Sequence, residues 1–168
     1  YLERAPRRGR TGGDGRPANH HFSAAFRAEQ FAVLIHDRDL GACRQADGTR
    51  LQGLLGTNYL VQNFGLSGTT LLKQGSKPYW STSYYSLSHG QSAETAPHIV
   101  IIMLGSNDST PWNWVYGTNY ISDYLDLIAT YVTNPYLPNP RILICTPPPA
   151  WSSDFSINPD ILATNISP

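Results

Sequence analysis

The chain has 168 residues, of which 40% are hydrophobic and 14% are charged. This length fits one domain of roughly 100–200 residues, and the apolar content is enough for a buried core. Twelve basic and twelve acidic residues give a net charge of zero, whereas nucleic-acid-binding domains normally carry a basic excess. The apolar runs are far shorter than the ~20 residues that cross a bilayer, so we expect no membrane span.

Two features at the N-terminal end set the domain boundaries that we predict. Residues 1–22 are rich in arginine and glycine and have no apolar periodicity, which predicts a disordered tail before a domain over 23–168. This segment also lacks the apolar stretch of a signal peptide. The chain begins at Tyr1 and its only methionine is Met103, which favours an incomplete copy of a longer protein.

Apolar runs separated by turn residues predict an alternation of strands and helices. The continuous, β-branched run His98–Leu104 is typical of a buried parallel strand that is covered on both faces. A helix over Tyr120–Val132 places Ile121, Tyr124, Leu125, Ile128 and Val132 at helical spacing. The further elements that we predict are strands over Phe31–His36, Tyr59–Phe64 and Arg141–Cys145, and a helix that ends with Leu51–Leu55 before Gly56.

This order predicts an α/β fold with a parallel sheet and helices on both faces. In such sheets the site lies where loops leave the carboxyl ends of the strands, here after Phe64, Leu104 and Cys145. Residues 65–70 (G-L-S-G-T-T) offer backbone N–H groups, and Asn107 in residues 105–108 (G-S-N-D) offers an amide donor. Together the two loops would form an oxyanion hole. The alternative is that both are ordinary turns, since Gly, Asn, Asp and Ser are the usual turn residues.

Residues 63–72 (N-F-G-L-S-G-T-T-L-L) and 100–109 (V-I-I-M-L-G-S-N-D-S) resemble the second and third sequence blocks of SGNH (GDSL-type) hydrolases. Residues 77–80 (K-P-Y-W) and 111–114 (P-W-N-W) resemble the sialate O-acetylesterase-like branch of carbohydrate esterases. The resemblance covers about Leu51 to Pro149. It implies a three-layer α/β/α sandwich with a flavodoxin-like parallel sheet. It also implies hydrolysis of an acyl ester or carbohydrate O-acetyl ester by a serine nucleophile and a histidine base, without a metal or organic cofactor.

Carried over residue by residue, the resemblance makes Gly65 and Asn107 the oxyanion donors, with Gly105 as a supporting residue. Asp108 is expected to shape its loop rather than to react. The substrate would be a small-molecule or carbohydrate ester, with no nucleic-acid partner. The resemblance is compatible with secretion, although no signal peptide is visible.

The chain departs from the family pattern at the nucleophile and at the base. Asp37 aligns with the aspartate of the family's G-D-S block, which puts Arg38 at the position of the nucleophilic serine. Arginine stays protonated and offers no lone pair, so it cannot attack an acyl carbon. The family's D-x-x-H block is also missing, because no histidine follows His98. We therefore expect the intact parent to be an esterase; the alternative is a non-catalytic module that binds acetylated carbohydrate.

The other candidate residues have simpler explanations. Ser67 lacks the second glycine of a G-x-S-x-G elbow, because Thr69 occupies that position, so a loop hydrogen bond is the expected role. His89 is expected in a loop and His98 at a strand edge. No Gly-rich phosphate loop supports a nucleotide-binding sheet. Three tryptophans are candidates for stacking on sugar rings or for plain loop packing, namely Trp80, Trp112 and Trp114. The two cysteines, Cys43 and Cys145, either pair or stay free.

Overall fold

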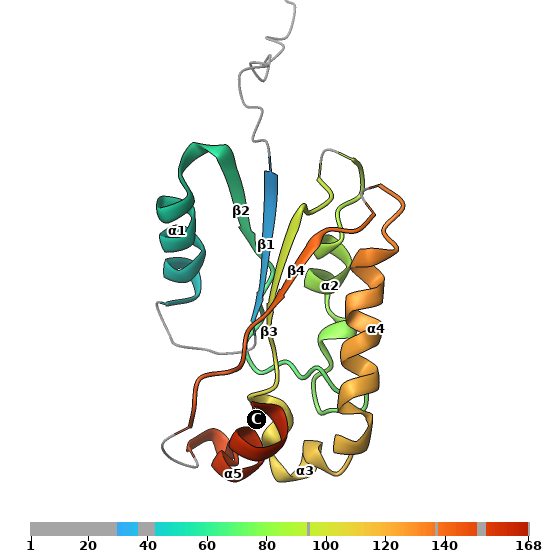
Figure 1. Cartoon of the computed structure of the whole chain (residues 1–168). Helices are drawn as coiled ribbons and strands as arrows, with labels where there is room; N and C mark the ends of the chain where they lie inside the picture. The colour runs from blue at the N-terminus through green and yellow to red at the C-terminus, as the bar shows by residue number, and fades with distance from the viewer. Residues whose placement is uncertain (1–29, 37–42, 94, 137, 151–153, 168) are drawn as a thin grey trace, which may run out of the picture.

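The computed structural model describes residues 30–36, 43–93, 95–136, 138–150 and 154–167 (Figure 1). Within them, four strands form one sheet in the order β2-β1-β3-β4, and every neighbouring pair is parallel. The strands are β1 (Gln30–His36), β2 (Tyr59–Asn63), β3 (Ile99–Met103) and β4 (Arg141–Ile144). The α/β fold with a parallel sheet is therefore confirmed, and all four strands lie where apolar runs predict them. The order 2-1-3-4 is that of the first four strands of flavodoxin-like sheets.

The two long helices lie where the sequence predicts them. Helix α1 (Cys43–Leu55) ends at Gly56, whose φ of 71° suits glycine, and α4 spans Tyr120–Val132. In Figure 1, α1 lies on one side of the sheet, and α2 (Ser83–Ser88) and α4 lie on the other. Short helices are α3 (Pro111–Trp114) and α5 (Pro159–Ile161), with 3-10 turns at Gly56–Asn58, Tyr79–Ser81, Asn107–Ser109, Gly117–Asn119 and Asp154–Ser156 and a π-type turn at Leu162–Ile166.

The main core lies between the sheet and the layer of α2 and α4. Val100 and Ile102 of β3 are fully buried and alternate with half-buried neighbours, as the two-residue period of a strand requires. They pack in one cluster with Leu127 and Tyr131 of α4 and with Leu71 from the loop after β2. That loop is therefore part of the core, which fixes the position of the residues it contributes to the site.

The buried face of α4 matches the spacing noted in the sequence only in part, at Tyr124 and Ile128. Ile121 and Leu125 are 66% and 59% exposed, while the buried stripe consists of Tyr120, Asp123, Tyr124, Leu127 and Tyr131. Tyrosine supplies more apolar area than isoleucine or leucine, and Asp123 is buried because it accepts a main-chain hydrogen bond described below. The exposed pair lines an apolar hollow of about 250 Å³ with Ile144 and Ile166.

The exposure of β4 shows that the described helices do not cover every strand of the sheet equally. Leu143 and Ile144 are 46% and 57% exposed, because β4 is the outermost strand of the described sheet on its side. A run of apolar residues therefore predicts the strand correctly but not its place at the edge. No helix in the described ranges has the length and apolar content that a membrane span requires. Cys145 is an exposed free thiol, and the side chain of Cys43 lies outside the described part of the chain.

Candidate active site

The two predicted loops meet at the carboxyl ends of the strands. Asn107 begins the 3-10 turn that follows β3, and its Nδ2 donates a hydrogen bond of 3.1 Å to the carbonyl oxygen of Thr69 in the loop after β2. The half-buried Asn107 amide thus bridges the loops that follow β2 and β3, the strands on either side of β1. Its contact with Thr69 differs from that of an asparagine that only caps its own turn.

Asp108 fixes the backbone of the loop after β2. Its side chain is completely buried, and its two carboxylate oxygens accept hydrogen bonds from the N–H groups of Leu71 (3.0 Å) and Leu72 (2.7 Å). Hydrogen bonds to an ionised acceptor are about twice as strong as those between neutral groups. Both carboxylate oxygens therefore accept hydrogen bonds from the main chain, which is the arrangement expected of a residue that shapes a loop.

Two further polar residues, which motif reasoning missed, extend this arrangement. Asn113 is buried in α3; its Oδ1 accepts from the N–H of Ser76 at 2.7 Å and its Nδ2 donates to the carbonyl of Asn107 at 2.8 Å. Asp123 of α4 accepts from the N–H of Lys73 at 2.9 Å. The sequence signal for Asp123 is a carboxylate that lies within the apolar stripe of α4. We call Asn107, Asp108, Asn113 and Asp123 the loop clamp, because each bonds the main chain of residues 69–76.

The two glycines of the predicted site have different environments. Gly105 has a φ of 130°, and a Cβ there would lie 2.6 Å from both Ile166 Cγ2 and Tyr120 Oη, so only glycine fits. The buried Gly65 donates its N–H to the Oδ1 of Asn63 at 2.8 Å. In this conformation, the N–H expected to bind an oxyanion has a protein acceptor.

The remaining site predictions have separate outcomes. Asp37 and Arg38 lie outside the described residues. Ser67 sits in a turn, where its carbonyl accepts a hydrogen bond from Lys77 Nζ at 2.8 Å. His98 precedes β3, so it lies at the end of the sheet opposite Gly105. In the described ranges, no group of three His, Cys, Asp or Glu side chains could hold a metal ion.

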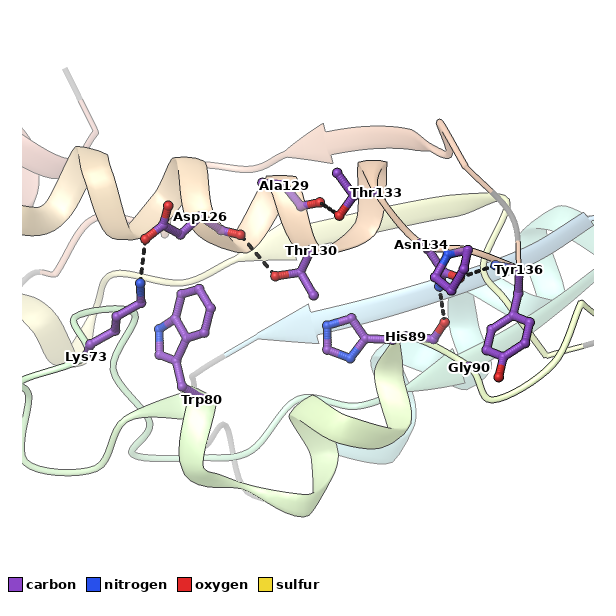
Figure 2. A pocket seen from close by; sticks show the side chains of 11 residues that line it. Lys73, Trp80, His89, Gly90, Asp126, Ala129, Thr130, Thr133, Asn134 and Tyr136 are labelled. Atoms are coloured by element: carbon purple, nitrogen blue, oxygen red, sulfur yellow. Dashed lines mark hydrogen bonds and ion pairs between the residues drawn. The ribbon is translucent and has the colours of Figure 1, made fainter.

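His89 lies in a separate groove between α2 and α4, shown in Figure 2. The groove has a volume of about 570 Å³, and no residue of the two family blocks lines it. The imidazole stacks on Tyr131 at 4.8 Å and meets the edge of Tyr85 at 4.5 Å, and burial lowers its pKa. Its Nε2 is buried without a hydrogen-bond partner among the described residues. These surroundings hold a neutral histidine away from the loop clamp.

The three candidate tryptophans have different roles. Trp80 donates its indole N–H to the carbonyl of Leu71 at 2.7 Å, and Lys73 Nζ lies 4.5 Å above its ring. Trp114 is partly buried against Tyr120, with the ring centroids 5.7 Å apart. Trp112 of α3 is 54% exposed. Two of the three therefore pack in the structure, and Trp112 is the one that presents its ring to solvent.

Comparisons with known proteins identify two similar esterases. The chain is 33% identical over 134 residues to an acetylxylan esterase of Xylanibacter ruminicola, in a match that covers 71% of this chain and 27% of that protein. Its fold is similar to the crystal structure of a carbohydrate acetylesterase from Sinorhizobium meliloti, with a TM-score of 0.51, 19% identity and coverage of 71% of this chain and 65% of that one. No family model matches the chain.

The sequence match falls on a carbohydrate esterase, as the two blocks predict, and the structural match shows the same type of fold. The chain is therefore similar to a carbohydrate esterase over 71% of its length. The chain spans 27% of the length of the curated relative.

Proposed function

We propose that this chain carries the oxyanion-binding half of an ester hydrolase that acts on O-acetyl groups of carbohydrate, such as those of acetylated xylan. The observation that carries the proposal is the placement of Asn107, whose amide bridges two loops at the carboxyl ends of the strands while Asn113 holds its carbonyl. The similarity to an acetylxylan esterase supports the substrate class.

Ester hydrolysis proceeds through a tetrahedral intermediate with a negatively charged oxygen, and donors held in advance lower the barrier to its formation. The amide of Asn107 donates to Thr69, which holds it at the carboxyl ends of the strands. We propose that the Asn107 amide donates to the ester oxygen in the substrate complex and that this oxygen replaces Asn63 Oδ1 as the acceptor for the Gly65 N–H. Catalytic hydrogen bonds commonly form only in the substrate complex.

The finer features of the fold are proposed on the same basis. Helices on both sides of the sheet support a complete three-layer α/β/α sandwich in the parent protein (Figure 1). We assign the esterase-like domain to residues 23–168, with Gly105 and Asp108 supporting the donors. A non-catalytic module that binds acetylated carbohydrate is the second candidate. Arg38 at the nucleophile position favours it for the chain as given.

The test uses a repaired variant with serine at position 38 and an added segment that carries the family's D-x-x-H block. The unrepaired chain should not hydrolyse p-nitrophenyl acetate above background, whereas the repaired one should release acetate from both this ester and acetylated xylan. In the repaired protein, Asn107→Ala should lower kcat by about 10²–10³-fold with little change in KM, the usual loss for one oxyanion donor.

Asn165→Ala is the matched control, because Asn165 is exposed on the C-terminal turn. It should leave kcat unchanged, and circular dichroism should show that both variants are folded. An unchanged rate per folded Asn107→Ala molecule would remove the oxyanion role from Asn107. A repaired variant that binds acetylated carbohydrate but releases no acetate would favour the binding module.

A further inference from the structure

The exposed side of α3 and its C-terminal end carry three large apolar side chains beside the proposed site. Trp112, Val115 and Tyr116 are 54%, 70% and 41% exposed. We call these three residues the aromatic strip. Helix α3 lies at the carboxyl ends of the strands in Figure 1 and begins two residues after the turn Asn107–Ser109. A ligand on the strip would therefore lie next to the loop that carries Asn107.

The segment that carries the strip contains no charged side chain. From Ser109 to Ser122, fourteen consecutive residues contain no Asp, Glu, Lys, Arg or His, although 14% of the chain is Asp, Glu, Lys or Arg. Residues 109–122 offer a ligand aromatic rings, hydroxyl groups and amides. Nucleic acids and anionic polymers need basic partners, so an uncharged strip does not suit them. A neutral sugar ring does match it, since its C–H faces can cover an aromatic ring while hydroxyl groups reach polar neighbours.

The strip is held rigidly relative to Asn107. Between Trp112 and Trp114, the buried Asn113 bonds both the carbonyl of Asn107 and the N–H of Ser76. Trp114 packs against Tyr120 and fills the space beside Gly117, where a Cβ would lie 2.7 Å from its ring. Because these contacts fix α3, the backbone at Trp112 keeps one position relative to the proposed oxyanion donors.

We propose that the aromatic strip binds the backbone of a neutral, O-acetylated polysaccharide, with Trp112 stacking on a sugar ring, so that a pendant acetyl group reaches Asn107. This inference rests on the proposed function and adds to it the position and the uncharged character of the glycan. It selects Trp112 over Trp80 and Trp114, whose rings are occupied by contacts within the protein.

The experiment measures binding to the chain as it exists, by calorimetry with neutral deacetylated xylo-oligosaccharides. Trp112→Ala should weaken binding at least tenfold, and Trp112→Phe should retain most of it because the aromatic face remains. Tyr136→Ala is the matched control. Tyr136 is also half exposed, at 50%, but it lines the groove between α2 and α4. Its variant should bind as the parent chain does.

Three results would overturn the proposal: no measurable binding by the parent chain, full binding by Trp112→Ala, or equally tight binding of polygalacturonate, an anionic glycan. Loss of binding in Tyr136→Ala alone would place the glycan in the groove instead. The repaired variant separates this proposal from the proposed function. Turnover of p-nitrophenyl acetate, which has no sugar, tests Asn107 and the proposed function, whereas oligosaccharide binding tests Trp112, so each proposal can fail without the other.

Discussion

The loop clamp and the groove around His89 both gather polar side chains from distant parts of the chain, but the His89 imidazole has different surroundings from the side chains of the clamp. In the clamp, carboxylates and amides bond to the main chain of residues 69–76. In the groove, His89 mostly meets aromatic rings, and its buried Nε2 has no partner among the described residues. Side chains bonded to backbone fix the course of a loop. The burial of His89 among aromatic rings instead affects the pKa of its imidazole. The clamp is therefore the better support for a site.

The largest effect should come from removing the carboxylate of Asp108. Asp108→Ala leaves the buried N–H groups of Leu71 and Leu72 without their acceptor. Each such N–H costs about 1–3 kcal/mol, so the free energy of unfolding should fall by about 2–6 kcal/mol. Urea denaturation followed by circular dichroism measures the change.

Asp160→Ala is the control for Asp108→Ala, because Asp160 is exposed in the first turn of α5. Its loss should stay within about 0.5 kcal/mol, as for ordinary surface substitutions. Equal losses in the two variants would show that the clamp does not stabilise the loop, and the contrast with the groove would disappear.

Sequence reasoning found the parts of the site that depend on local pattern. The run around Val100 predicts a strand because its apolar residues are continuous, and Gly105 and Asn107 follow from the motif after that strand. Asn113 and Asp123 were missed because their partners, Ser76 and Lys73, are 37 and 50 residues away in sequence. Such a pairing depends on how α3 and α4 pack on the loop, which no local pattern encodes.

The errors about burial have the same origin. Tyr124 of the predicted stripe is buried, but Ile121 and Leu125 are exposed, and Tyr120 takes a place on the buried side of α4 instead. Apolar spacing on a helix defines candidate stripes, and the neighbouring loop decides which stripe is covered. The aromatic surroundings of His89 were also not predictable, because Tyr131 comes from α4, on the far side of β3 in the sequence.

A smaller effect should appear when the pH is lowered. Burial lowers the pKa of His89 from 6.5, so the folded state binds fewer protons than the unfolded state between the two pKa values. The contribution of the neutral imidazole to stability is complete above about pH 6.5. It falls as the pH drops from there toward the lowered pKa of the folded state.

The variants His89→Phe and His89→Gln test this dependence, since neither side chain titrates. The free energy of unfolding at pH 7.5 minus that at pH 5 should be smaller in both variants than in the parent chain, because the other histidines contribute equally to each protein. Phenylalanine also keeps a ring against Tyr131, so its stability at pH 7.5 isolates the role of packing. The same pH difference in all three proteins would show that His89 does not titrate in the folded state as its burial implies.

The smallest effect should come from Asp126, which differs from Asp123 although both carboxylates lie near Lys73. The side chain of Asp126 is 60% exposed and pairs with Lys73 Nζ, a pairing that raises the pKa of Lys73. That of Asp123 is 7% exposed and accepts the main-chain N–H. Exposed ion pairs contribute about 0–1 kcal/mol because water and salt screen them, so Asp126→Ala should cost no more than that and nothing measurable in 1 M salt. Asp123→Ala should cost more at both salt concentrations, because it leaves the Lys73 N–H without its acceptor. Equal losses, both removed by salt, would show that charge near Lys73 matters and that the hydrogen bond to its backbone does not.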